Sequence, residues 1–157
     1  MHATTEDPEI SGAADSLSLD QQLCFAVYSC SNRVSRMYRL FLQPIGITFT
    51  QYLVLLALWE KDSRNISELA QVLDLEPNTI TPMVKRMEIL GLVSRTRHPY
   101  DERQVRVALT EKGRALRSEV SAIRHDLMER LDMPAERMAE IRAAVEQFAD
   151  RVATIKA

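Results

Sequence analysis

The chain has 157 residues, enough for one domain or for one domain with an extended dimerisation arm. Hydrophobic residues make up 46% of it, so a real core can form, and the scarcity of Gly (4) and Pro (6) favours a mostly helical fold. Its apolar runs fall far short of the ~20 residues that a membrane span needs, and the N-terminus lacks a secretory signal pattern. We therefore expect a cytoplasmic protein that does not contact a membrane.

The charge is distributed unevenly along the chain. A formal net charge of −2, taken alone, argues against nucleic acid as a partner. Residues 1–20 hold five acidic groups and no Lys or Arg, whereas residues 85–106 hold six Lys or Arg and three acids. Such a local basic surface can bind phosphate whatever the global sum, although a solvated charged face is the simpler interpretation from charge alone.

Hydrophobic spacing predicts the elements of the first half of the chain. Residues 1–15 have no apolar period and are expected to form a mobile tail. Residues 50–60 predict a buried helix that is apolar nearly all round, and residues 61–65 predict a polar turn. Residues 18–43 predict a long helix, because its apolar residues recur at spacings of three and four: Leu23, Val27, Cys30, Val34, Met37 and Phe41.

A helix-turn-helix pattern follows. Ser67 can cap a short helix that runs through residue 73. Pro77 suits the first turn of a second helix, which runs to about residue 90 and which Gly91 ends as a C-terminal cap. The positions of this second helix that are expected to face the core are Ile80, Val84 and Met87.

The period then changes from helical to alternating. Residues 92–96 and 104–109 predict two short strands with a polar tip between them. Thr110 is expected to cap a helix that reaches about residue 131, and Pro134 opens the last helix. That last helix carries an apolar seam with heptad spacing, formed by Met138, Ile141, Val145, Phe148, Val152 and Ile155. The pattern predicts a mainly α fold with a small β-hairpin wing.

A helix-turn-helix followed by a hairpin can bind duplex DNA, because the second helix can enter the major groove. The polar positions of that helix that can contact base edges or phosphates are Asn78, Thr79, Thr81, Lys85 and Arg86. On the hairpin, Arg95 and Arg97 lie on the approaching strand, and an Arg at the tip, Arg103, can enter the minor groove. Asp101 can hold Arg103 by a charge-assisted bond, which is equally an ordinary turn ion pair.

Residues 48–113 resemble the MarR family of bacterial transcription regulators. The matching segments are NISELAQVLDL at 65–75, NTITPMVKRMEILGLVSR at 78–95 and DERQVRVALTEKG at 101–113. The resemblance implies a winged helix-turn-helix in an intertwined homodimer, a palindromic double-stranded DNA operator and, in most members, repression. Glu76, just before Pro77, departs from the pattern, because Glu is a poor N-cap and its carboxylate would approach DNA phosphates.

The same resemblance predicts how the chain is divided. We expect a mobile acidic tail, a first dimerisation helix that carries a sensing site, a DNA-binding lobe and C-terminal dimerisation helices, at residues 1–17, 18–47, 48–110 and 111–157.

A second stripe runs along the first long helix, formed by Cys24, Tyr28, Ser31, Ser35 and Tyr38. Hydroxyl donors favour the thiolate, which is the reactive form of cysteine. Tyr28 lies one turn from Cys24, whereas Tyr38 lies about 21 Å along the helix axis and can reach only a partner's Cys24, if the two first helices cross antiparallel. We infer a composite site from two chains; the alternative is an inert buried cysteine.

Two further segments, LDQQLCFAVYS at 19–29 and ITFTQYLVLLALWE at 47–60, resemble the organic-hydroperoxide sensors of the MarR family (OhrR-like). In that branch peroxide oxidises the cysteine that matches Cys24, and tyrosines that match Tyr38 and position 49 hydrogen-bond to it. Here position 49 is Phe49, so the thiolate should be less stabilised unless Tyr52, Ser31 or a water substitutes.

Cys30 lies on the apolar stripe and is expected in the core. It is about 9 Å from Cys24 along the axis and on another face, whereas a disulfide needs alpha carbons within about 7 Å. Residues 110–157 contain no cysteine. We therefore expect a sulfenic acid at Cys24 that a low-molecular-weight thiol caps or that is overoxidised, with a disulfide to Cys30 of the partner subunit or of an unwound helix as the fallback.

Three functions remain open. The leading hypothesis is a regulator that releases DNA when a peroxide oxidises Cys24. The alternative is a regulator gated by an aromatic or phenolic ligand between the dimer arms and the DNA-binding lobe, with Tyr28, Tyr38, Phe49 and Tyr52 lining the pocket. An enzyme is disfavoured, because the sequence has no Gly-rich phosphate loop, catalytic triad or metal-ligand spacing, and we expect no cofactor.

Overall fold

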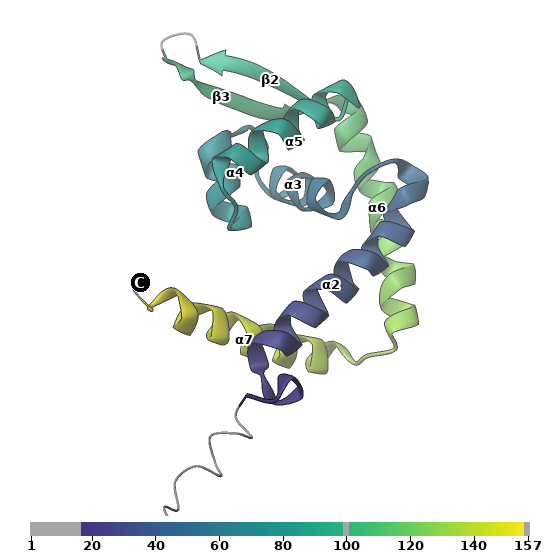
Figure 1. The fold of residues 1–157 in the computed structure, drawn as a ribbon. Helices are drawn as coiled ribbons and strands as arrows, with labels where there is room; N and C mark the ends of the chain where they lie inside the picture. The colour runs from purple at the N-terminus through teal and green to yellow at the C-terminus, as the bar shows by residue number, and fades with distance from the viewer. Residues whose placement is uncertain (1–16, 99–100, 156–157) are drawn as a thin grey trace, which may run out of the picture. The chain divides into compact units, whose positions relative to one another are not determined.

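The computed structural model describes residues 17–98 and 101–155, and the side chains of these residues except 98 and 101–104. This part of the chain contains six α-helices and a small three-stranded antiparallel sheet (Figure 1). The prediction of a mainly helical fold with a hairpin wing is confirmed. The chain divides into two compact units between Leu53 and Val54.

The first unit is built around α2 (Leu23–Leu42), which begins later than the sequence predicts. A 3-10 turn, η1 (Leu19–Gln21), precedes it, and the hydroxyl of Ser18 donates a hydrogen bond to Asp20. Gln22, between this turn and α2, has an extended backbone with φ −84° and ψ 116°, so the helix begins only at Leu23. A second 3-10 turn, η2 (Gln43–Ile45), follows α2.

α3 (Phe49–Glu60) begins with a reciprocal cap. The N–H of Thr48 donates to Gln51 Oε1 at 2.9 Å, and the N–H of Gln51 donates to Thr48 Oγ1 at 3.3 Å. The helix is largely buried, as predicted, and Leu55 and Leu58 are fully enclosed. No single helix in the described ranges is long and apolar enough to span a membrane. α2 with η2 and α3 together meet the criteria of length and composition, but a 76° bend separates the two helices.

α4 (Ile66–Leu73) and α5 (Pro77–Ile89) form the helix-turn-helix of the second unit. The prediction that Ser67 caps α4 is wrong. Asn65 is the N-cap, because its side chain accepts the Glu68 N–H at 2.8 Å while the Glu68 carboxylate accepts the Asn65 N–H at 2.7 Å. α5 ends as predicted, with Gly91 just past it at a φ of 71°.

β2 (Val93–His98) and β3 (Asp101–Leu109) form the hairpin, and both strands are longer than predicted. Figure 1 shows the hairpin lying along α5. A third strand, β1 (Arg64–Asn65), pairs antiparallel with β3 in a segment predicted as a turn, and the strand order is β1-β3-β2. Two residues are too few to show an alternating pattern, so only the tertiary pairing reveals this strand.

α6 (Glu111–Leu131) and α7 (Ala135–Ala153) complete the chain. Thr110 caps α6, as predicted, by accepting the N–H of Gly113 at 3.0 Å. The apolar seam of α7 is only partly covered within the described chain: Met138 and Phe148 are half-buried, whereas Val145 and Val152 are each 49% exposed. Ile155, the last residue assigned to the seam, lies beyond the end of the helix.

The first turn of α6 is bonded to the end of α5. The hydroxyl of Thr110 donates to the carbonyl of Gly91 at 2.6 Å, and Lys112 Nζ donates to the carbonyl of Leu90 at 2.8 Å. These two side chains satisfy carbonyls that a helix C-terminus otherwise leaves unpaired. The position of α5 is therefore tied directly to α6.

Gly113 lies against the backbone of Leu92, the residue just before β2. A Cβ at this residue would stand 2.1 Å from the carbonyl oxygen of Leu92, far inside contact distance. Its own carbonyl accepts the indole N–H of Trp59 at 2.9 Å, which ties α6 to α3. This position accepts a side chain only if the backbone shifts.

Replacing Gly113 by Ala is expected to lower the free energy of unfolding by about 2 kcal/mol or more, because the new methyl group collides with backbone and not with a movable side chain. Urea denaturation measures the change. Ser121→Ala, at an exposed position of the same helix, is the control and should leave the midpoint nearly unchanged. Equal midpoints for the two variants would show that the backbone yields easily here.

Asp62 joins three segments around its carboxylate. Oδ1 accepts the N–H of Leu109 at 2.9 Å and the N–H of Ser63 at 2.7 Å, and Oδ2 accepts Arg114 Nη2 at 2.8 Å. Partial burial acts to raise the pKa of Asp62, but the hydrogen bonds from Leu109, Arg114 and Ser63 outweigh it and hold the pKa below its usual value. The ionised form is therefore favoured in the folded protein.

The pH dependence follows from the sign of this shift. A carboxyl group with a lowered folded pKa stabilises the fold above its unfolded pKa of about 3.9 and loses that contribution as the pH falls through the folded value. Asp62→Asn should therefore be less stable than the wild type at pH 7, with a gap that narrows below about pH 4. Thermal unfolding across this range measures the gap, with Asp150→Asn as the control; a gap independent of pH would contradict the role of the charge.

Candidate DNA interface and thiol site

One face of α5 is polar and exposed, and the opposite face is buried. Ile80, Val84 and Met87 are fully buried, as predicted. Asn78, Thr79, Lys85 and Arg86 are exposed on the other side. Polar residues with amide, hydroxyl and cationic groups on one helix face can contact base edges and phosphates together.

Two residues of α5 depart from this simple division. Thr81 is only partly exposed, and its hydroxyl donates to the carbonyl of Pro77 at 2.9 Å, so its donor is used within the helix. Pro82 lies inside the helix, which the sequence analysis did not single out. Since proline has no N–H, the helical bond to the carbonyl of Asn78 is missing. The N-terminal half of this helix therefore has fewer internal bonds than the rest.

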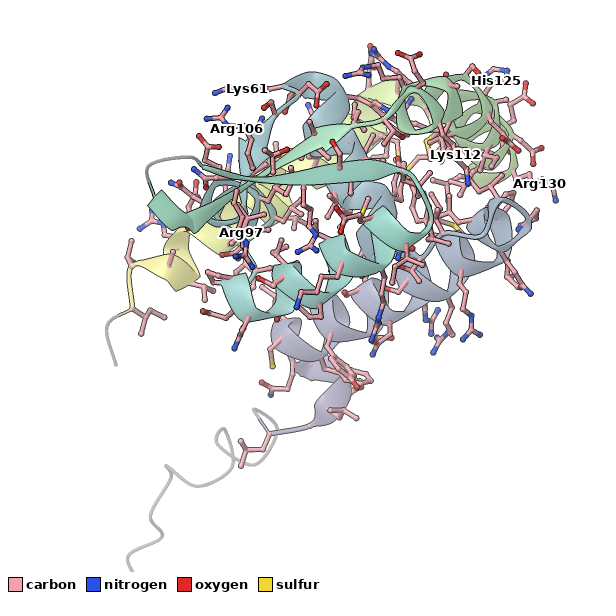
Figure 2. All side chains as sticks on the ribbon, turned by 90° about the horizontal axis from the view of Figure 1, so that it is seen from above. Lys61, Arg97, Arg106, Lys112, His125 and Arg130 are labelled. Carbon is pink, nitrogen blue, oxygen red and sulfur yellow. The ribbon has the colours of Figure 1, made fainter. Side chains whose placement is uncertain are left out.

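Two arginines on the wing have different environments. Arg97 is exposed and lies on β2 toward the tip of the hairpin (Figure 2). Arg95, which the sequence placed on the strand leading to the hairpin tip, pairs with Glu88 of α5. The side chains of Asp101 and Arg103 lie outside the described residues, so the predicted bond between them stays a prediction.

Cys24 is the second residue of α2 and is exposed. It lies in the first helical turn, where the helix dipole stabilises negative charge. Tyr28, one turn later, is 66% exposed. Cys30 is exposed too, so its predicted placement in the core is wrong for the described chain. Its neighbours on the apolar stripe are also exposed, with Leu23 at 57% and Val27 at 37%.

The aromatic residues predicted for the sensing site gather at the other end of α2. The ring of Tyr38 stacks on Phe49 with centroids 4.7 Å apart and on Tyr52 with centroids 5.2 Å apart. Tyr52 is only 4% exposed. This cluster unites three of the five predicted residues. Along the helix axis, Tyr38 lies about 21 Å from Cys24 and about 15 Å from Tyr28 of the same chain.

An open groove borders this aromatic cluster. Its volume is about 690 Å³, within the range of small-molecule sites. Of its lining residues, Ser35 belongs to the predicted stripe on the first helix and Phe49 to the predicted sensing site. The other lining residues include Arg39, Leu40, Gln43 and Thr48, which were not predicted. The signal that could have found it is charge: Arg33, Arg36 and Arg39 lie in a stretch between Asp20 and Glu60 that contains no acidic residue.

Residues 36–120 match the family model described as transcriptional regulator SarA/Rot, which covers more than half of the chain. The chain belongs to this family. It is a transcriptional regulator of the MarR/SarA type, a class of DNA-binding proteins that are not enzymes. The resemblance inferred from the segments around the helix-turn-helix and the wing is confirmed.

Two bacterial regulators are similar to this chain in sequence. The chain is 35% identical over 131 residues to the organic hydroperoxide resistance transcriptional regulator of Bacillus subtilis, covering 83% of this chain and 89% of that protein. It is 45% identical over 114 residues to the regulator TtmR of Methylorubrum extorquens, covering 73% of this chain. The matched region spans only 58% of the length of TtmR.

The fold is similar to that of AbfR, a protein of Staphylococcus epidermidis. Reduced AbfR bound to DNA matches with a TM-score of 0.75 and 33% identity, covering 90% of this chain and 99% of that chain. Overoxidised AbfR bound to DNA also matches with a TM-score of 0.75, at 32% identity and 88% and 97% coverage. The winged helix-turn-helix predicted from sequence is thus shown for this regulator.

Lys85→Gln is expected to weaken binding to the duplex upstream of the regulator's own gene and to reduce the salt dependence of binding by about one counterion, because a phosphate contact is lost. Fluorescence anisotropy at several salt concentrations measures both quantities. Arg124→Gln removes the same charge at an exposed position of α6 and serves as the control. If the two variants have the same slope, Lys85 does not contact phosphate.

Proposed function

We propose that this regulator binds a palindromic DNA operator as a homodimer and releases it when a peroxide oxidises Cys24. The observation that carries the proposal is the exposed thiol in the first turn of α2, in a chain related to an organic hydroperoxide resistance regulator. Exposure and a position that favours negative charge are the conditions under which cysteines react.

The DNA-binding part of the proposal rests on the polar face of α5 and on the wing. Asn78, Thr79, Lys85 and Arg86 are exposed on one helix, and Arg97 is exposed on the adjacent strand. A helix in the major groove with a wing beside it can use the residues of α5 and of β2 together. We place Asp101 and Arg103 at the wing tip in this interface, and Thr81 contributes its hydroxyl oxygen. Repression follows when the operator overlaps a promoter.

The homodimer is supported by apolar side chains that remain exposed in the described part of the chain. Leu23 of α2 is 57% exposed, and the seam residues Val145 and Val152 of α7 are each 49% exposed. A heptad-spaced seam is buried when a second helix packs against it. If the two copies of α2 cross antiparallel, Tyr38 lies near Cys24 of the partner subunit and the site is composite.

The redox chemistry needs two steps. The Cys24 thiolate attacks one oxygen of an organic hydroperoxide, the O–O bond breaks, and the products are a sulfenic acid and, after protonation, an alcohol. A low-molecular-weight thiol then condenses with the sulfenic acid to form a mixed disulfide and water. Because AbfR is also found on DNA in its overoxidised form, we assign release in this regulator to the bulkier thiol-capped form.

Phe49 modifies this site. It has no hydroxyl to donate, and its ring stacks on Tyr38. Tyr52 also stacks on Tyr38, and its side chain is almost fully buried. We therefore propose that Tyr38 and Tyr28 supply the hydroxyl groups near the thiol and that Phe49 fixes the ring of Tyr38 by packing.

Cys24→Ser tests the proposal, with Cys30→Ser as the matched control, since both thiols are exposed on the same helix. We expect one equivalent of cumene hydroperoxide with a small thiol to weaken DNA binding of the wild type and of Cys30→Ser by at least 100-fold, and to leave Cys24→Ser unchanged. Anisotropy measures the release, and mass spectrometry identifies the modified residue. Release of Cys24→Ser by the oxidant, or no release of the wild type, contradicts the proposal.

A second candidate is a regulator gated by a small aromatic or phenolic ligand. The groove beside Phe49 favours it, because its volume of about 690 Å³ and its mixed lining suit such a molecule. The two candidates separate in the same assay: a ligand releases Cys24→Ser as well as the wild type, whereas an oxidant releases only proteins with the Cys24 thiol.

A further inference from the structure

One carboxylate makes three contacts with one residue of the wing. Glu88 lies in the last turn of α5, and its Oε1 accepts the backbone N–H of Arg95 at 3.1 Å. Its Oε2 accepts Arg95 Nε at 2.8 Å and pairs with Arg95 Nη2 at 2.8 Å. The side chain of Glu88 is 36% exposed and that of Arg95 is 27% exposed. This pair is therefore better shielded from solvent than the ion pairs within α6 and α7.

This geometry fixes a strand as well as a side chain. β2 is an edge strand, because the order in the sheet is β1-β3-β2. The N–H of Arg95 donates to Glu88 and is thereby satisfied at the open edge of the sheet. A guanidinium held at two nitrogens by a carboxylate has a defined orientation as well as a favourable energy.

An acid at this place needs a structural reason. Glu88 follows Lys85 and Arg86 on the proposed DNA-binding helix, and an unpaired carboxylate there would repel phosphates. Arg95 cancels that charge, while Arg97, two residues further along the same strand, has no ion pair in the described part of the chain. The two arginines therefore have separate roles.

We propose that Glu88 is a positioning residue: with Arg95 it locks the wing to α5, so that the helix and the wing engage DNA as one rigid unit. The inference rests on the proposed DNA interface. Under it, Arg95 is not a phosphate ligand, and Arg97 reaches DNA only from a wing held in place by Glu88. Losing the lock releases the wing and leaves the contacts of α5 in place.

A double-mutant cycle tests the lock with Glu88→Gln, Arg95→Gln and the double variant. We expect each single variant to bind the operator about tenfold more weakly and the double variant to bind no worse than either, because both substitutions break one interaction. Hydroxyl-radical footprints should lose protection in the minor groove at the flanks and keep it at the centre. Glu111→Gln, which removes the same charge from a carboxylate that is 99% exposed, should change neither.

Two results would overturn the lock. If Glu88→Gln binds more tightly, with a salt dependence steeper by about one counterion, Arg95 is a phosphate ligand that Glu88 withholds. If affinity falls but protection is lost evenly over the whole site, the substitution damages the lobe and not the wing. Failure of the wild type to bind the operator would instead refute the proposed function, so the two failures are distinguishable.

Discussion

The close contact between the first turn of α6 and the carbonyl of Leu92 is the constraint on which the DNA-binding unit depends. Gly113 permits this approach, because any side chain there would meet backbone at 2.1 Å. The Thr110 hydroxyl then reaches the carbonyl of Gly91 just beyond α5, and Asp62 bridges β3 to Arg114. The end of α5, the base of the wing and the start of α6 are therefore bonded to one another, so a displacement of α6 would reach the proposed DNA contacts.

Charge in this regulator is organised locally, and the global sum conceals it. The net charge of −2 includes an N-terminal segment with five acids, while the surface proposed for DNA carries the cations of α5 and the wing. Glu88 places a negative charge on that surface, and Arg95 neutralises this charge in a partly buried ion pair. An ion pair of this kind contributes orientation more than affinity, since desolvation offsets much of its attraction.

The proposed sensing chemistry divides between the two ends of α2. The thiol lies in the first turn, and the aromatic cluster of Tyr38, Phe49 and Tyr52 lies near the last. A single straight helix keeps these groups about 21 Å apart. The proposed site is therefore complete only when a second copy supplies the opposite end, so thiol oxidation would act at the interface of the proposed dimer.

The sequence by itself determined the helices, the helix-turn-helix, the wing and the family, because apolar period, proline and glycine positions and caps such as Thr110 act over a few residues. It placed Ile80, Val84 and Met87 in the core for the same reason. It missed the Asn65 cap, although Asn-x-x-Glu is a local capping-box pattern. It also missed β1, the partner of Arg95 and the exposure of Cys30. These depend on which distant segments meet, since a two-residue strand or an ion pair between a helix and a strand has no local period, and only the tertiary structure decided them.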